Sequence, residues 1–283
     1  MKYIKLKIQR FWANVSKGRF FAFETAREFL APIPKLRILF SEKCAGEHLI
    51  RKGFKMLRHE VDFDVILPEK MKNYDLVIPL NMEDLYLMQK FPELIKNNLI
   101  PIPSVESTVI CDDKFLFNKI LVEKGFRDYL PKIGQDLSLP FLVKKKVSYA
   151  GAGCYFVYDE RQKKEYCDLI KSPDYFCQEI IRGEYEYDVH ILFKNHQILT
   201  SFTIENSFEK DSYLKGVDDY ICTKIVKSPY LHIFSEILDS INFEGLCCFN
   251  YKENNGKPSI FEINPRFDGS LSRYFFTFLR HLN

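Results

Sequence analysis

The segment FEINPRFDGS, residues 261–270, constrains what this chain can fold into more than any other part of the sequence. The pattern over 259–264 predicts a strand that ends at Pro265, because proline cannot donate a hydrogen bond to a sheet. Side chains alternate along a strand, so Glu262 and Asn264 project from one face. Carboxylate and amide oxygens are hard donors that Mg²⁺ accepts. The segment therefore predicts either a cation site or an ordinary strand that runs into a polar turn.

Arg266 lies directly after this expected strand. Its planar guanidinium suits two oxygens of a phosphate or a carboxylate. The sequence has no GxGxxG motif after its first expected strand, no GxxxxGK[ST] motif and no GxSxG motif. It therefore lacks the signatures of a dinucleotide site, a P-loop and a serine-nucleophile elbow.

The composition indicates a globular chain. With 283 residues, 46% hydrophobic and 28% charged, it is long enough for one or two domains with a sizeable core. The sequence shows neither an apolar run of membrane-spanning length nor the apolar core of a signal peptide, so we expect a cytoplasmic location. Eight cysteines without CxxC spacing are typical of reduced thiols. A net charge of +3 is too small to indicate a nucleic-acid partner.

The first 35 residues are distinctly basic. They carry eight Lys or Arg and two Glu, a charge of +6, so the remaining chain carries −3. A basic amphipathic helix over residues 1–30 can make peripheral contact with an anionic membrane or dock on its own domain. Alternation at Ile4, Leu6 and Ile8 leaves an edge strand open as well. The expected helical stripe comprises Ile4, Ile8, Phe11, Trp12 and Val15.

Strands and helices alternate over residues 36–102, which predicts parallel strands with crossover helices. The expected strands are Leu36 to Phe40, Phe63 to Leu67, Leu76 to Leu80 and Leu99 to Ile102, with helices near Glu47 to Arg58 and Met82 to Lys96.

Two lysines and a small-residue loop follow. Lys114 begins a helix behind an aspartate that we expect to be its N-cap. Lys144 ends an apolar strand over 141–144. The loop SYAGAG, residues 148–153, has small side chains that let backbone N–H groups approach an anion closely. These features together predict a phosphate site.

A further strand precedes Gly183 and could present Gln178 to an adenine edge, and Glu184 would then reach a ribose.

With these motifs in this order, the chain resembles the ATP-grasp superfamily, especially its carbamoyl-phosphate-synthase-like and carboxylate-amine ligase branches. The resemblance covers about residues 36–283. It implies a mixed α/β and α+β fold, with a small parallel α/β domain at 36–105 behind a two-part ATP-grasp domain at 106–283. The lid subdomain would occupy about 112–180 and the metal-bearing subdomain about 181–283.

The resemblance also implies roles for individual residues, ATP and Mg²⁺ being the ligands. The nucleotide-binding residues would be Lys114, Lys144, Ser148, Ala150, Gly151, Gly153, Gln178, Glu179, Ile181 and Glu184. The metal ligands would be Glu262 and Asn264, and Arg266 would lie near the transferred phosphoryl group.

Two departures from the family pattern leave alternatives open. A second metal-ligand position of the family falls at Cys248, whose thiol is a soft donor that suits Mg²⁺ poorly. Either Asn250 substitutes for it, or the metal relies on Glu262, Asn264 and water. The strand over 198–204 lacks an arginine that some relatives have there, and Lys210 or Lys215 could supply that charge.

The resemblance implies a ligase that activates a small-molecule carboxylate as an acyl phosphate and joins it to an amine, ADP being released. The alternative is an ATP-binding module that has lost turnover, because Ser148 and Ala150 stand where glycines are common and Cys248 replaces a hard ligand.

Overall fold

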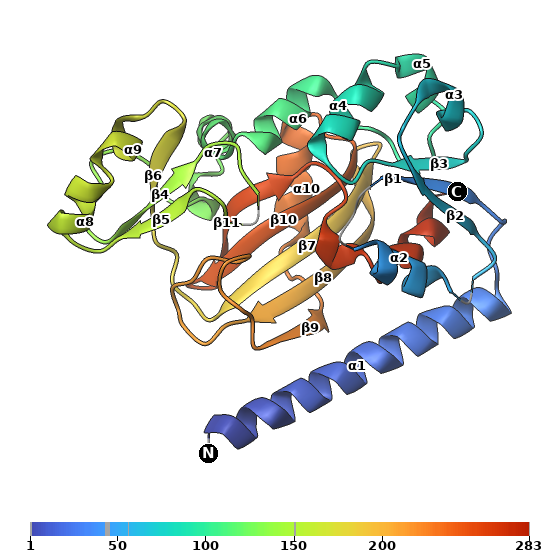
Figure 1. Ribbon diagram of the computed structural model, residues 1–283, viewed down its shortest axis with the longest axis horizontal. Helices are drawn as coiled ribbons and strands as arrows, with labels where there is room; N and C mark the ends of the chain where they lie inside the picture. Colours follow the sequence, from blue (N-terminus) through green and yellow to red (C-terminus); the bar gives the residue numbers. More distant parts are fainter. Residues whose placement is uncertain (1, 43–45, 56, 150, 283) are drawn as a thin grey trace.

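The computed structural model describes residues 2–42, 46–55, 57–149 and 151–282. Three β-sheets make up the body of the molecule, and one long helix lies along an edge of it (Figure 1).

The N-terminal sheet has three parallel strands: β1 (Arg37–Ser41), β2 (Glu60–Asp64) and β3 (Leu76–Ile78). The order β2-β1-β3 places β1 in the centre, and its apolar residues are fully buried because elements cover both faces. The predicted parallel α/β unit is thus confirmed. Its helices are α2 (Glu47–Phe54), α3 (Pro68–Met71), α4 (Met82–Gln89) and α5 (Pro92–Ile95).

The strand predicted over 99–102 is wrong, because no strand forms there. The side chain of Asn98 takes its place: Oδ1 accepts from the Val77 N–H at 2.7 Å and Nδ2 donates to the Val77 carbonyl at 3.1 Å. Pro101 and Pro103 could not have donated to a ladder at this edge. The helix predicted over 82–96 is interrupted before Pro92.

A second sheet is antiparallel, in the order β5-β4-β6, and consists of β4 (Phe141–Lys145), β5 (Cys154–Val157) and β6 (Tyr175–Glu179). Short helices α8 (Glu160–Glu165) and α9 (Cys167–Lys171) belong to this lobe, at the left of Figure 1. The helices α6 (Val105–Asp112) and α7 (Lys114–Glu123) connect it to the N-terminal sheet.

The largest sheet is antiparallel, with the order β11-β10-β7-β8-β9. One face packs on α10 through an apolar core. The opposite face packs on the N-terminal sheet and the C-terminal turns through residues such as Leu192 and Leu246. Its elements are β7 (Tyr185–Lys194), β8 (Gln197–Ser207), β9 (Cys222–Val226), α10 (Leu231–Ser240), β10 (Gly245–Asn254), β11 (Lys257–Asn264), and the 3-10 helices η2 (Gly269–Leu271) and η3 (Phe275–His281).

The predicted mixed α/β and α+β architecture is confirmed. The three sheets lie within the predicted ranges 36–105, 112–180 and 181–283, and the domain boundaries themselves stay predictions.

The N-terminal segment forms one helix, α1 (Lys2–Leu30), so the edge-strand alternative is wrong. Phe20 packs on Phe202 and Tyr274, and Phe21 packs on Phe276, which ties the helix to the body. The side chains of Ile4 and Ile8 lie outside the described part of the chain. In the ranges that the structure describes, no helix has both the length and the apolar character needed to cross a bilayer.

Candidate active site

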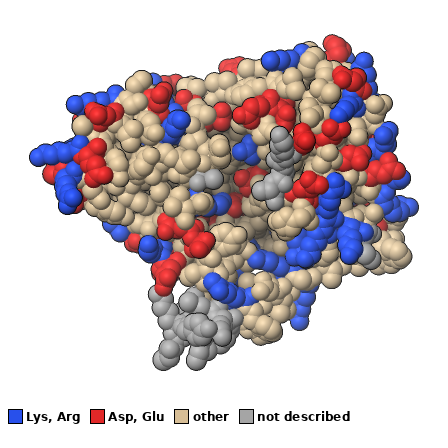
Figure 2. All heavy atoms as spheres, in the orientation of Figure 1, with Lys and Arg blue, Asp and Glu red and all other residues tan. Residues whose placement is uncertain are grey.

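A cavity of about 640 Å³ lies between the β4-β5-β6 lobe and the five-stranded sheet. Figure 2 shows the surface hollowed near the centre of this face, with charged side chains of both signs inside the hollow. Most of the predicted site residues line this cavity, although they come from well-separated parts of the chain. They are Lys114, Lys144, Ser148, Gly151, Gln178, Ile181, Glu262, Asn264 and Arg266.

Other predicted residues are placed differently. Glu184 is exposed and does not line the cavity; Glu186, two residues further along the chain, is buried and does. The Glu179 carboxylate turns away to accept the Lys132 N–H at 2.7 Å, which leaves only its backbone for a ligand. Gly153 does not line the cavity either. Ala150 lies outside the described residues.

Lys114 enters the cavity from the first turn of α7. Asp113 caps this helix as predicted, because its side chain accepts the N–H groups of Phe115 and Leu116, each at 2.9 Å. Lys114 Nζ donates to the Ser148 carbonyl at 2.6 Å and lies 3.4 Å from Glu262 Oε2. The lysine therefore links the loop over 148–153 to β11.

Lys144 is a buried cation at the end of β4, with its Nζ 3.3 Å from Gln178 Oε1. Burial lowers its pKa, and the nearby Glu262 carboxylate opposes that shift. Burying an ammonium group is costly unless an anion compensates it. An anionic ligand beside Lys144 would supply the missing compensation.

The loop at 148–153 needs glycine at two described positions. Gly151 and Gly153 have φ of +72° and +70°, a region that other residues rarely adopt. A Cβ on Gly151 would lie 2.7 Å from the Lys215 carbonyl oxygen. The close approach brings this loop against the loop over 206–220, so the two loops together border the cavity.

Arg266 lines the cavity just beyond the end of β11. Its Nη1 donates to the Phe267 carbonyl at 2.8 Å. Its Nε is buried and, among the described residues, has no hydrogen-bond partner. Unsatisfied buried donors are costly, so this guanidinium fits a site that receives anionic oxygens.

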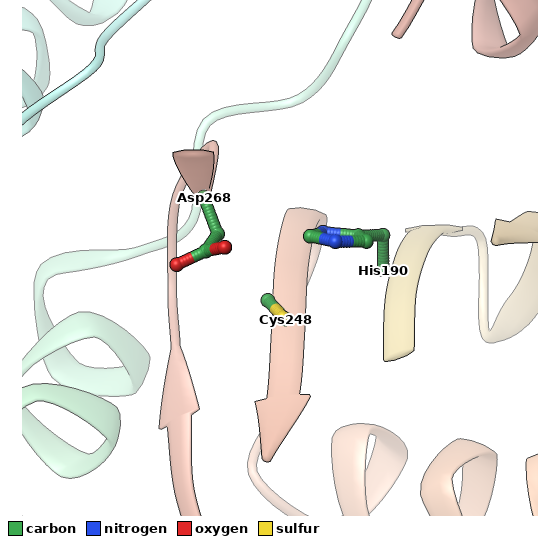
Figure 3. A group of neighbouring side chains, drawn as sticks. All are labelled: His190, Cys248 and Asp268. Atoms are coloured by element: carbon green, nitrogen blue, oxygen red, sulfur yellow. The ribbon is translucent and has the colours of Figure 1, made fainter. Parts of the chain in front are cut away.

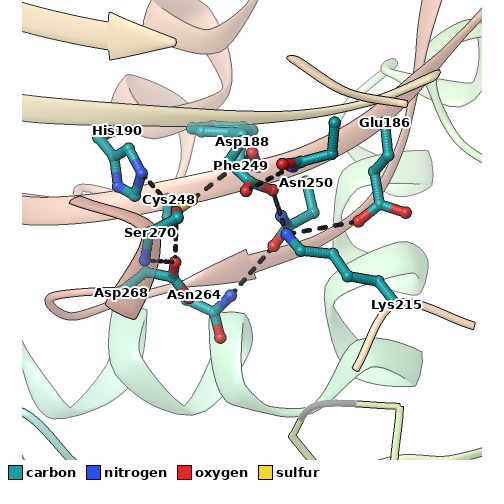
Figure 4. A network of polar contacts seen from close by, with 11 residues as sticks. Glu186, Asp188, His190, Lys215, Cys248, Phe249, Asn250, Asn264, Asp268 and Ser270 are labelled. Carbon is teal, nitrogen blue, oxygen red and sulfur yellow. Dashed lines mark hydrogen bonds and ion pairs between the residues drawn. The ribbon is translucent and has the colours of Figure 1, made fainter. Parts of the chain in front are cut away.

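The strands β10 and β11 bring the predicted metal ligands together. Asn250 pairs with Glu262 in the antiparallel register, and both line the cavity together with Asn264. Asn264 Nδ2 donates to Asn250 Oδ1 at 3.1 Å, so the Asn264 carbonyl oxygen is the atom available to a cation (Figure 4). A carboxylate and an amide oxygen side by side fit Mg²⁺.

Cys248 does not line the cavity, whereas Asn250 does. Burial raises the pKa of the Cys248 thiol well above its ordinary value, so the thiol stays protonated. The sequence left open whether Asn250 takes the place of Cys248 or the metal relies on Glu262, Asn264 and water. The position of Asn250 at the cavity favours the first alternative.

An ion-pair network of Lys215 with two buried carboxylates borders the cavity (Figure 4). The Lys215 ammonium contacts the Asp188 carboxylate and lies 3.6 Å from Glu186 Oε1. Asn250 Nδ2 donates to Asp188 Oδ1 at 2.5 Å. Burial lowers the pKa of Lys215, but the Asp188 and Glu186 carboxylates outweigh this and raise it well above its ordinary value. Lys215 is thus held as a cation at the cavity wall, whereas Lys210 is exposed beside Asp218.

His190, Cys248 and Asp268 form a compact cluster next to this network, with potential ligand atoms within 4.8 Å of one another (Figure 3). A hydrogen-bond chain already links His190 to Asp268, because His190 Nε2 lies 2.8 Å from Ser270 Oγ, which donates to Asp268 Oδ1 at 2.7 Å. Burial lowers the pKa of His190, so the imidazole is neutral at pH 7. This cluster positions η2, whose residues form the far wall of the cavity.

A sequence model of the ATP-grasp domain matches residues 111–270, more than half of the chain. The chain belongs to the ATP-grasp family. Among curated relatives, it is similar to the carbamoyl phosphate synthase large chain, C-terminal section, of Aquifex aeolicus (strain VF5), with 21% identity over 179 residues. The match covers 57% of this chain and 33% of the relative, so the chain spans about a third of that protein's length.

Solved structures show the same ATP-grasp fold. D-alanine–D-alanine ligase from Bacillus anthracis is 16% identical, with a TM-score of 0.59 over 87% of this chain and 97% of the ligase. A structure of that ligase complexed with ATP is 16% identical, with a TM-score of 0.54 over 82% of this chain and 87% of the ligase. Phosphoribosylamine–glycine ligase from Thermotoga maritima is 14% identical, with a TM-score of 0.63 over 84% of this chain and 70% of that ligase.

Several residues in and beside this ATP-grasp cavity were not predicted from the sequence. Glu186 lines the cavity, and Asp188 and His190 are buried on the same strand without lining it. Polar residues repeated at every second position of a buried strand are the signal that could have identified them. Lys252 is buried on β10, donates to the Ile181 carbonyl at 3.1 Å and lies over the Tyr213 ring. No local pattern distinguishes this lysine from a solvated one.

Proposed function

We propose that this chain is an ATP- and Mg²⁺-dependent ligase that activates a substrate carboxylate as an acyl phosphate and joins it to an amine. The observation that carries the proposal is the convergence of three cations, Lys114, Lys144 and Arg266, with the oxygen donors Glu262 and Asn264 in one cavity. Phosphoryl transfer needs charge neutralisation and positioning more than a protein nucleophile.

Lys114, Lys144 and the 148–153 loop would bind the ATP phosphates. The two buried ammonium groups line the cavity from α7 and from β4, so a polyanion between them would compensate both charges. The apolar side chains of Leu142 and Phe156 line the same cavity and suit the adenine ring. The backbone after Gln178 would meet its edge. ATP in the complex of the similar D-alanine–D-alanine ligase supports this choice of nucleotide.

Glu262 and Asn264 would hold Mg²⁺, which would neutralise phosphate charge when bound. Lys114 lies 3.4 Å from Glu262, so this carboxylate also positions a phosphate-binding cation. The two functions of Glu262 do not compete, because a carboxylate has two oxygens that accept several partners.

In the reaction, a carboxylate oxygen of the substrate attacks the γ-phosphorus, and the bond to the β–γ bridging oxygen breaks, which releases ADP. The amine then attacks the acyl carbon, phosphate leaves, and the amine loses a proton. Arg266 would hold oxygens of the transferred phosphoryl group through its Nε, which has no hydrogen-bond partner among the described residues. The structural similarity to two amide-forming ligases supports this reaction class.

One argument for the alternative, an ATP-binding module without turnover, was that Cys248 replaces a hard metal ligand. The structure weakens that argument. Cys248 does not line the cavity, and Asn250 provides a hard oxygen there instead. The ligase is therefore the function that the arrangement favours.

A product screen tests the proposal. The chain is incubated with ATP, Mg²⁺ and pooled small carboxylates and amines, and mass spectrometry detects condensation products while ADP is measured. We expect ADP and a product whose mass equals acid plus amine minus water. ATP binding without ADP release under any acid and amine pool would contradict the ligase and favour the binding module.

A further inference from the structure

The outward face of α1 exposes an unusual set of apolar side chains. Among the described residues, every exposed phenylalanine, tryptophan and leucine lies on this helix: Phe11, Trp12, Phe23, Phe29 and Leu30, each between 60% and 83% exposed. Folded monomers seldom expose large apolar side chains together unless the surface binds a partner.

These side chains lie along one side of the helix as an apolar stripe. Phe11 and Phe29 are 18 residues apart, as are Trp12 and Leu30, which is five turns of an α-helix, so each pair lies on one line. Phe23 lies beside the second line. The helix is about 43 Å long and lies along the edge of the molecule in Figure 1, so its stripe is accessible along its length.

The opposite side of the helix is fixed to the body. Arg10 Nε donates to the Ile221 carbonyl at 2.7 Å, Lys17 contacts Thr223, and Glu28 pairs with Arg280 at 2.8 Å. Phe20 and Phe21 pack on the core. Docking on the domain, the alternative that the sequence left open, therefore accounts for one side of the helix and leaves the stripe unpartnered.

The carboxylates of α1 are turned away from the stripe. Its only acidic residues, Glu24 and Glu28, have side chains 12% and 9% exposed and pair with Arg27 and Arg280. The exposed Arg19 lies within the apolar stripe. The sequence adds lysines at positions 2, 5 and 7. Among the described residues, the outward side thus combines apolar side chains with the Arg19 guanidinium and carries no carboxylate.

We propose that α1 binds the surface of a membrane that contains anionic lipids, with its apolar stripe inserted at the headgroup boundary. An amphipathic helix with a basic character and an aromatic edge lies in this plane. The exposed Arg19 within the stripe attracts anionic headgroups. A second copy of the chain fits less well, because two such faces would bring like charges together.

Trp12 makes the test direct, because it is the only tryptophan in the chain. The full-length protein is mixed with vesicles of phosphatidylcholine and phosphatidylserine, and its tryptophan emission and co-sedimentation are measured. We expect a blue shift of the emission, protection from acrylamide quenching and sedimentation with the vesicles. Vesicles of phosphatidylcholine alone, or ~1 M salt, should weaken all three signals because the charge attraction is lost or screened.

The matched variants separate the stripe from general charge. The double variant Phe23→Asp, Phe29→Asp keeps the Trp12 reporter and should lower the partition coefficient at least about tenfold, because two exposed aromatic contacts are lost. The control Val65→Asp, Val105→Asp makes the same charge change at exposed apolar sites outside α1 and should bind like the original protein.

Two results would overturn the proposal. One is equal vesicle binding by the α1 variant and the original protein. The other is a Trp12 blue shift that depends on protein concentration without lipid, together with a dimer in sedimentation, which would assign the stripe to a second copy.

Discussion

At the scale of single residues, the cavity is built from charges that need partners. Lys144 is buried beside Gln178, and the Nε of Arg266 has no partner among the described residues. Lys215 is held as a cation by Asp188 and Glu186. Burying cations in this way lowers the stability of the folded chain, and an anionic ligand in the cavity would offset that loss.

The variant Lys144→Ala should weaken ATP binding by about 1.5 to 3 kcal/mol, the usual contribution of a hydrogen bond to a charged group. Lys145→Ala is the matched control, because Lys145 is the next residue on β4 and is exposed. Calorimetry on both variants measures the difference. Equal affinities in two folded variants would remove Lys144 from the nucleotide site.

Asp268 should make stability depend on pH. Burial raises its pKa, but Lys215, His190 and the hydrogen bonds from Ser270 outweigh burial and hold the pKa at about 2. The carboxylate is thus ionised more readily in the folded chain than in the unfolded one, so its contribution is present above pH ~4 and is lost as the pH falls toward 2.

Asp268→Asn should therefore lower the free energy of unfolding by about 1 to 2 kcal/mol at pH 7, since water in the cavity screens part of the effect. Urea unfolding of both proteins at several pH values measures the gap, which should narrow below pH 4. A gap that stays constant down to pH 3 would contradict this account.

At this scale, the sequence predicted the residues that stand at recognisable positions. Lys114 follows a helix cap, Arg266 follows a strand end, and Lys144 and Glu262 lie near the ends of their strands. All four line the cavity. Lys215 could be named only as an alternative to Lys210, and Lys252 could not be distinguished from a solvated lysine, because the surroundings of both depend on elements distant in sequence. Glu184 was placed one alternation too early, since Glu186 is the residue that faces the cavity.

At the scale of elements, contacts between loops shape the cavity. The 148–153 loop touches the Lys215 carbonyl through Gly151, where a side chain would not fit. The element pattern itself was largely predictable, because hydrophobic periodicity and caps identify helices and strands locally. The strand at 99–102 was not, because the Asn98 side chain that replaces it acts across the fold.

Gly151→Ala should weaken ATP binding while the chain stays folded, since the added Cβ pushes the two loops apart. Gly256→Ala is the control: Gly256 has φ of +73°, close to the +72° of Gly151, but no atom lies within 4 Å of its added Cβ. Both variants should lose about 1 to 2 kcal/mol of stability from backbone strain. Only Gly151→Ala should also lose nucleotide affinity; equal affinities would show that the loop contact does not shape the site.

At the scale of the whole molecule, the N-terminal sheet and the five-stranded sheet share one apolar core, whereas the β4-β5-β6 sheet has a smaller core of its own. The C-terminal η3 packs on the N-terminal sheet through Phe275, whose ring lies 5.6 Å from that of Phe40. The cavity lies between the other two sheets, so its residues meet only when the fold is complete. The family resemblance predicted this arrangement, which periodicity alone could not, because the packing of the sheets depends on long-range contacts.

The central claim is that the cavity binds ATP together with Mg²⁺ at Glu262 and Asn264. Calorimetry of ATP binding with and without Mg²⁺, on the original protein and on Glu262→Gln, tests it without a known substrate. Glutamine keeps the shape of the side chain and removes its charge, so the variant should fold normally. We predict that Mg²⁺ strengthens ATP binding to the original protein at least tenfold more than to Glu262→Gln, on the order of a lost charged contact. The same enhancement by Mg²⁺ in both proteins would contradict the assignment of this site.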